Sequence, residues 1–149
     1  MNILTLENRG SVSFYMTDYL QKEGHEVFDA YNTGDAQSIW ESDNYRIDCM
    51  IVDLNVIPVG FSTEQKKRSQ DGLLAGWVWL SDYVLTKDAT MRKRTIIYSR
   101  YINDLREDVG DEKLEGIRLV PKSDSASTAE QIIRHIQAID NMLERKRNG

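Results

Sequence analysis

Short apolar runs alternate with amphipathic segments along the whole chain, and this order limits the folds that the chain can adopt. Each run has the length of a buried β-strand, and apolar residues at helical spacing follow it. Strands separated by helices favour a parallel sheet with helices on both faces, because each crossover must return the chain to the same end of the sheet. The expected strands are 3–6, 25–30, 48–53, 95–99 and 117–120.

Five helices are expected between and after these strands. Apolar spacing predicts the first four over 11–23, around 36–40, over 71–84 and over roughly 102–114. The last helix is expected to start with a capping box, in which Ser127 and Glu130 each satisfy a backbone N–H group of the other. Residues 56–70 show no periodicity, and a loop of this length inside a compact domain is often functional.

The composition favours one soluble domain over 1–149 that ends in a basic tail at 144–149. The net charge of −5 argues against direct nucleic-acid binding. No apolar stretch approaches the roughly 20 residues that span a membrane, and the start of the chain lacks the features of a signal peptide. The single cysteine, Cys49, is expected to be a buried thiol in a core strand. These features favour a cytoplasmic protein.

Polar residues capable of chemistry stand where four of the expected strands end. Glu7 and Asn8 follow the first strand, Asp53 ends the third, Ser99 ends the fourth and Lys122 follows the fifth. We expect these side chains to converge, because the carboxyl ends of parallel strands share the edge where ligands bind in open α/β sheets. A carboxylate nucleophile, a lysine, a hydroxyl and oxygen ligands for a divalent cation are the groups that phosphoryl transfer to an aspartate requires.

Short motifs in a fixed order support this interpretation over nearly the whole chain. They are Ile3-Leu4-Thr5-Leu6-Glu7-Asn8, Gly24-His25-Glu26-Val27 with Ala30 and Gly34, Met50-Ile51-Val52-Asp53, Asp71-Gly72, Ile96-Ile97-Tyr98-Ser99 and Val120-Pro121-Lys122. At this spacing the chain resembles the receiver domain of two-component response regulators. The resemblance implies an α/β fold in three layers, with a doubly wound five-stranded parallel sheet of flavodoxin-like order 2-1-3-4-5 and a long loop after the third strand.

The same resemblance assigns roles to the strand-end residues. It implies that Asp53 is the phosphoacceptor, Ser99 the switch hydroxyl and Lys122 the phosphate-binding lysine. The Mg²⁺ ligands that it implies are Glu7, Asn8, Asp53 and the backbone carbonyl of Asn55.

The function that the resemblance implies is a stand-alone phosphoreceiver switch. A histidine kinase or phosphotransfer protein would supply the phosphoryl group to Asp53. An output protein that the sequence does not identify would read the change through protein contacts, on the face of the fourth helix and the fifth strand. Enzymatic activity would extend no further than phosphorylation and dephosphorylation of the chain's own aspartate.

Several positions depart from the family pattern. Asn8 stands where the family has a second carboxylate, so the affinity for Mg²⁺ should fall. Arg100 replaces a small residue after the switch hydroxyl and could shield the site or contact the phosphoryl group. Ser123 replaces the proline after the lysine, which predicts a trans peptide bond there. Leu119 replaces an aromatic switch residue, and the loop at 56–70 is longer than the family's short turn.

Two other functions remain open from the sequence. Asn8 and Arg100 also suit a receiver-like interaction module that no longer takes a phosphoryl group. Metal-dependent nucleic-acid enzymes of the toprim type likewise place a Glu after a first strand and an Asp-x-Asp after a later one, but this chain has Asn55 at the second Asp position. A flavin-binding protein is disfavoured, since no phosphate-binding loop rich in Gly, Ser or Thr follows the first strand.

Overall fold

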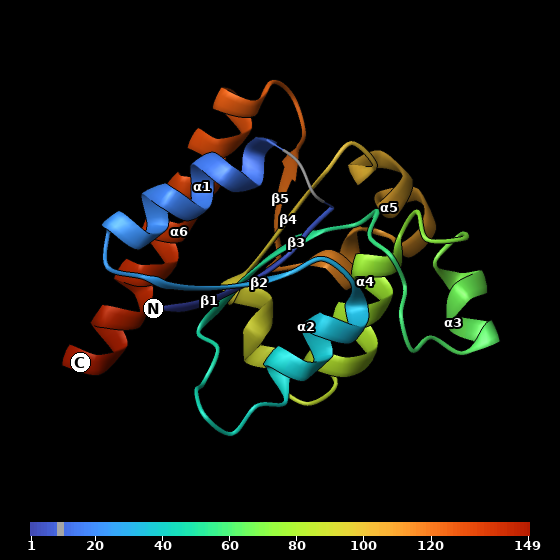
Figure 1. Cartoon of the computed structure of the whole chain (residues 1–149), viewed down its shortest axis with the longest axis horizontal. Helices are drawn as coiled ribbons and strands as arrows, with labels where there is room; N and C mark the ends of the chain where they lie inside the picture. The colour runs from blue at the N-terminus through green and yellow to red at the C-terminus, as the bar shows by residue number, and fades with distance from the viewer. Residues whose placement is uncertain (9–10) are drawn as a thin grey trace.

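The computed structural model describes residues 1–8 and 11–149, and it shows a central sheet between two layers of helices (Figure 1). The strands are β1 (Asn2–Leu6), β2 (Glu26–Ala30), β3 (Cys49–Asp53), β4 (Thr95–Ser99) and β5 (Arg118–Pro121). Neighbouring strands pair in parallel, in the order β2-β1-β3-β4-β5. The three-layer, doubly wound fold expected from the sequence is confirmed.

Helices cover the two faces of the sheet unequally. One face carries two long helices that lie side by side, α1 (Ser11–Lys22) and α6 (Ser125–Asn148). The other face carries α2 (Thr33–Trp40), α4 (Ala75–Trp79), α5 (Ile102–Val109), the π-helical segment η1 (Leu80–Leu85) and the 3-10 segments η2 (Ala89–Arg94) and η3 (Asp111–Leu114). Side chains that alternate along each strand therefore enter two separate cores.

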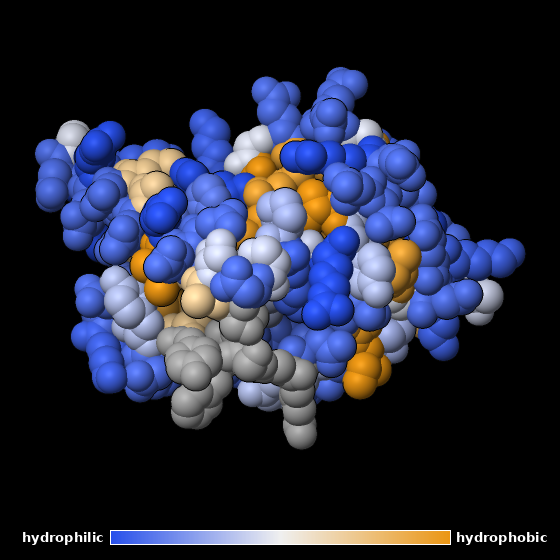
Figure 2. All heavy atoms as spheres, turned by 90° about the horizontal axis from the view of Figure 1, so that it is seen from above, coloured by the Kyte–Doolittle hydropathy of each residue, from blue (hydrophilic) through white to orange (hydrophobic). Residues whose placement is uncertain are grey.

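Among the residues whose burial the structure describes, the two cores take up most of the large apolar side chains, and Ile57 and Val59 are exposed. Ile51 and Ile96 face α1 and α6, while Val52 and Ile97 face α2, α4 and α5. Seen from above, the surface is mainly hydrophilic, with hydrophobic residues in small patches (Figure 2). No helix in the described part of the chain is long and apolar enough to cross a bilayer.

The segment expected to be an irregular loop at 56–70 contains a helix, so that prediction is wrong in part. The helix α3 (Thr63–Arg68) is short, which hides its periodicity in the sequence. It begins with a capping box: the Ser62 side chain accepts from the Gln65 N–H group, and the Gln65 side chain accepts from the Ser62 N–H group. Before α3, Ile57 forms a parallel bridge with Asn32 at the start of α2.

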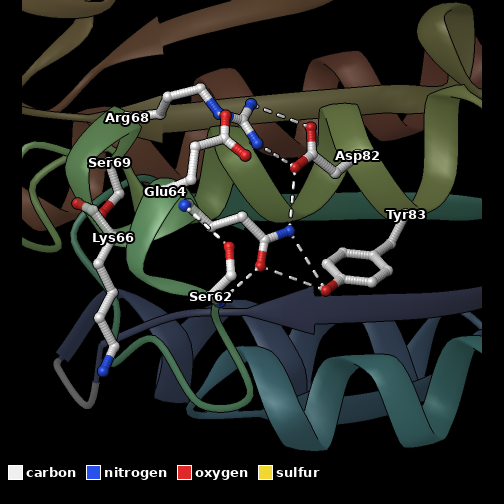
Figure 3. A network of polar contacts seen from close by, with 8 residues as sticks. Ser62, Glu64, Lys66, Arg68, Ser69, Asp82 and Tyr83 are labelled. Carbon is white, nitrogen blue, oxygen red and sulfur yellow. Dashed lines mark hydrogen bonds and ion pairs between the residues drawn. The ribbon is translucent and has the colours of Figure 1, made fainter.

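A polar network ties α3 to η1 (Figure 3). The guanidinium of Arg68 donates to both carboxylate oxygens of Asp82, and Gln65 Nε2 donates to Asp82 Oδ2 at 3.0 Å. Gln65 Nε2 also lies 3.2 Å from the hydroxyl of Tyr83. Burial alone would raise the pKa of Asp82, but the bonds from Arg68 and Gln65 outweigh burial and lower it. Residues 56–70 are therefore a folded insert held on both sides, rather than a free loop.

Three expected helix boundaries are corrected by local backbone chemistry. The helix expected from residue 71 begins at Ala75, because Gln70 and Asp71 adopt positive φ angles of 51° and 56° and turn the chain. The helix expected over 102–114 ends at Val109, where Gly110 with φ 87° interrupts it before η3.

The start of α6 is the third correction. The capping box expected from Ser127 and Glu130 is wrong. With Ser127 as the N-cap the first helical residue would be Thr128, but the helix begins three residues earlier, at Ser125. Asp124 is the N-cap, and its Oδ1 accepts from the Ser127 N–H group at 2.9 Å. Aspartate is as good an N-cap as serine, so the earlier of two possible caps started the helix.

Candidate functional site

Asp53 and Lys122, predicted from two different strand ends, meet at the carboxyl edge of the sheet. Asp53 ends β3 with 2% of its surface exposed, and Lys122 Nζ donates to its Oδ2 at 2.7 Å. The sheet sets this contact: Ser99 pairs with Pro121 in register, and the Lys122 N–H group donates to the Ser99 carbonyl at 3.0 Å. The lysine therefore leaves β5 one strand away from β3 and reaches back across β4 to the carboxylate.

Ser99 is buried at the end of β4, with 1% of its surface exposed. Its Oγ accepts a hydrogen bond from the Tyr101 N–H group at 3.1 Å. A hydroxyl that accepts one bond still has its own proton to donate. Ser99 is thus held in place by the turn that follows β4 while it remains able to donate to a group bound beside Asp53.

Glu7 lies at the end of β1 and is 1% exposed. The hydroxyl of Tyr98 donates to Glu7 Oε2 at 3.0 Å, and Lys122 Nζ lies 4.8 Å from the centroid of the same tyrosine ring. Burial raises the pKa of Tyr98 well above its usual value, and the negative charges of Glu7 and Asp53 raise it further. Tyr98 therefore stays protonated in any ordinary buffer and acts as a donor.

Tyr98 is the residue of this site that sequence reasoning missed. It lies in the apolar run of β4, where an aromatic side chain is an ordinary core residue. The signal available in the sequence was its position one residue before Ser99, at the carboxyl end of the strand.

The other predicted residues differ in their exposure. Asn8, Asn55 and Arg100 are exposed, whereas Leu119 is half-buried and packs against the core under α2, α4 and α5. The Lys122–Ser123 peptide bond is trans, as expected from the missing proline.

A glycine in α4 brings that helix directly against the end of β3. The Gly76 N–H group donates to the Leu54 carbonyl at 2.9 Å. A Cβ atom at this position would stand 2.0 Å from the backbone oxygen of Asp53. Only glycine allows this approach without displacing the strand end that carries Asp53.

The oxygen-rich side of the site suits a hard divalent cation. Mg²⁺ is commonly held by one or two carboxylates together with several water molecules. Glu7 and Asp53 are two buried carboxylates whose negative charges both act on Tyr98, and the exposed Asn8 and Asn55 follow them closely in the chain. Among the described residues no cluster of three or more Asp, Glu, His or Cys side chains is grouped to hold a metal. Two buried carboxylates at the edge of the sheet are thus donors of the kind that suits Mg²⁺.

Comparison with known proteins gives a likeness in structure but not in sequence. No protein-family model and no curated protein sequence matches the chain. The receiver domain of HemR from Leptospira biflexa superposes with a TM-score of 0.64 at 13% identity, over 93% of this chain and 92% of that one. The chain has the receiver-domain fold.

Other receiver domains agree with this assignment. A response regulator receiver protein from Sinorhizobium medicae gives a TM-score of 0.60 at 14% identity, over 95% of this chain and 94% of that one. The receiver domain of a Francisella response regulator gives 0.59 at 16% identity, over 95% and 98%. At such identities the likeness extends to the fold alone, so the chemistry of this receiver-like chain has to be argued from its own residues.

Proposed function

We propose that this chain is a phosphoreceiver signalling domain that accepts a phosphoryl group on Asp53. The observation that carries the proposal is the buried Asp53 carboxylate at the carboxyl edge of a receiver-type sheet, with the Lys122 ammonium 2.7 Å from it. Open α/β sheets bind ligands at this edge. A carboxylate and a lysine in contact there would serve as the nucleophile and the phosphate-binding group.

In the transfer step, an oxygen of Asp53 forms a bond to phosphorus while the bond from phosphorus to the donor breaks. With a histidine kinase or phosphotransfer protein as donor, the leaving group is the histidine nitrogen, which keeps the electron pair of that bond. The Lys122 ammonium then moves from the carboxylate to an oxygen of the phosphoryl group, and the Ser99 hydroxyl donates to another. A Mg²⁺ ion held by Glu7, Asn8, Asp53 and the carbonyl of Asn55 would neutralise charge on the phosphoryl oxygens.

Signalling would follow from the movement of Lys122 and Ser99. Ser99 is the last residue of β4, and Lys122 directly follows β5. A backbone hydrogen bond links the two residues, in which the Lys122 N–H group donates to the Ser99 carbonyl. The Ser99 side chain also accepts from the Tyr101 N–H group just before α5. A change at the phosphoryl group is therefore passed to the surface of α5 and β5, where an output protein would bind.

The test is phosphorylation by acetyl phosphate and complex formation with beryllofluoride, each in the presence of Mg²⁺. We expect intact-protein mass spectrometry to show the addition of one phosphoryl group, with peptide mapping placing it on Asp53. Asp53→Asn should abolish the addition, while Asp104→Asn, at an exposed aspartate in α5, should not. Absence of any mass shift and of any spectral change with beryllofluoride would sink the proposal.

A second function is favoured by one specific observation, the neutral Asn8 in place of an acidic metal ligand. A receiver-like module that binds partners without phosphorylation would tolerate this change. For that function, Asp53→Asn should leave partner binding unchanged, whereas for the phosphoreceiver it should remove the dependence of partner binding on phosphodonor.

A further inference from the structure

Tyr98 is a buried aromatic residue at the centre of the site that the proposed chemistry does not use. Its hydroxyl donates to Glu7 Oε2 at 3.0 Å, and its ring centroid lies 4.8 Å from Lys122 Nζ. Lys122 in turn donates to Asp53 Oδ2 at 2.7 Å. One side chain thus contacts both the carboxylate expected to bind a cation and the ammonium expected to bind a phosphoryl group.

The sheet holds Tyr98 in this position before any ligand arrives. On one side it pairs with Asp53 of β3, and on the other with Val120 of β5. Only 2% of its surface is exposed. A residue held by hydrogen-bonded strands on both sides and packed in a core keeps one orientation, so its hydroxyl points at Glu7 as a fixed donor.

We propose that Tyr98 is a positioning residue for the divalent cation, because it holds the Glu7 carboxylate in the orientation in which the carboxylate binds the ion. The inference rests on the proposed function, since it requires Glu7 to be a cation ligand. Carboxylates that bind metals are themselves commonly oriented by hydrogen bonds from neighbouring groups. A carboxylate can accept about four bonds, so a bond from the phenol and a bond to a cation are compatible.

The orientation of Glu7 matters more in this chain because Asn8 stands where the family has a second carboxylate. With an amide at that position, the site has one negative charge fewer than the family pattern, and Coulomb attraction for a cation is reduced accordingly. Orienting the remaining carboxylates in advance lowers the entropy that binding has to overcome. Tyr98 supplies that orientation for Glu7, and its ring at the same time limits the positions open to Lys122.

The test is a titration of the full chain with Mn²⁺, followed by electron paramagnetic resonance, which detects the free ion directly. Tyr98→Phe removes the hydroxyl and keeps the ring beneath Lys122. We expect it to weaken Mn²⁺ binding by roughly 10- to 100-fold. Tyr19→Phe is the matched control, because the Tyr19 hydroxyl bonds Gln137 at 3.5 Å on α6, and its affinity should equal that of the wild type. Glu7→Gln gives the reference loss for a missing ligand charge.

A second measurement separates positioning of the cation from general damage to the fold. The rate of Asp53 phosphorylation by acetyl phosphate is followed as a function of Mg²⁺ concentration. We expect Tyr98→Phe to reach the wild-type rate at high Mg²⁺, with only the half-saturating concentration raised. A rate that stays low at every Mg²⁺ concentration would show damage to the fold or to Lys122 and would overturn the inference.

The outcomes also distinguish this inference from the function on which it rests. Wild-type affinity or tighter binding in Tyr98→Phe, together with a loss in Glu7→Gln, overturns the role of Tyr98 and leaves the phosphoreceiver function intact. A wild-type chain that binds neither Mn²⁺ nor Mg²⁺ overturns both.

Discussion

At the scale of single residues, the Asp53–Lys122 contact affects stability as well as chemistry. The Asp53 side chain is 3% exposed and the Lys122 side chain 23%. Removing one partner of such a pair leaves a buried charge without compensation, whereas replacing both partners is far less costly. The lysine therefore compensates the buried charge of the group that is the nucleophile in the proposed reaction.

Lys122→Met is therefore expected to lower the free energy of unfolding by about 1–3 kcal/mol, less than for a fully buried pair because Lys122 is partly exposed. Adding Asp53→Asn should recover most of this loss. Urea unfolding at pH 7 measures both effects. Lys22→Met is the control: it breaks an exposed pair with Asp18, and should change stability by less than about 0.5 kcal/mol. A double variant no more stable than Lys122→Met would contradict this explanation.

At the scale of elements, the insert adds a helix without moving the end of β3. The chain leaves the strand at Leu54 and returns at Gly76, whose N–H group donates to the Leu54 carbonyl. Between these points, Ile57 is bridged to Asn32 and α3 is bonded to Asp82 of η1 (Figure 3). Because both ends of the insert are held together, its length does not disturb the position of Asp53.

Gly76→Ala should disturb that position directly. Its Cβ would meet the backbone oxygen of Asp53 at 2.0 Å, so either α4 or the end of β3 has to move. We expect a loss of about 3 kcal/mol, at the upper end for an overpacked core, together with reduced phosphorylation of Asp53.

Gly34→Ala is the matched control for this prediction. At Gly34 the nearest atoms belong to side chains, Val59 Cγ1 at 2.8 Å and Val59 Cβ at 3.1 Å, whereas at Gly76 the nearest atom is a backbone oxygen at 2.0 Å. The added methyl group also favours the helix by up to about 1 kcal/mol. Thermal unfolding followed by circular dichroism should show a smaller loss for Gly34→Ala than for Gly76→Ala, because the shift required at Gly34 is smaller and spares the end of β3. Equal losses in the two variants would count against a specific role of Gly76.

At the scale of the whole molecule, the sheet separates two cores, and Cys49 lies in the one beneath α1 and α6. Its thiol is fully buried, and burial raises its pKa to about 12. In the unfolded chain the thiol ionises near the ordinary value of 9.0. The folded state therefore loses stability as the pH rises from about 9 towards 12, because only the unfolded chain releases the proton in that range.

We expect the native protein to resist an aromatic disulfide reagent at pH 8, and to react fully once unfolded in urea. The labelling rate under native conditions then reports the opening of this core. Cys49→Ala should lose less stability than the wild type between about pH 9 and pH 10, while keeping the same fold by circular dichroism; above pH 10 the raised pKa of buried Tyr98 adds a loss of its own. Rapid labelling of the native protein would show that this core opens more readily than the structure indicates.

Much of the fold was predictable because it depends on patterns that are local in the sequence. Apolar runs of four to six residues between turn signals favour buried strands, and the order of strands and helices leaves few parallel topologies open. The boundaries were less predictable, since Asp124 competes with Ser127 as a cap and α3 is too short to show a period. Such choices depend on small free-energy differences between neighbouring residues.

By itself, the sequence determined which residues stand at the strand ends, and hence that Glu7, Asp53, Ser99 and Lys122 share one edge of a parallel sheet. Only the tertiary structure decided which of them touch. Lys122 and Asp53 are 69 residues apart, and Tyr98 and Glu7 are 91 apart. Contacts at such separations depend on strand register and on side-chain direction, which arise when the strands pair and the two cores pack around them.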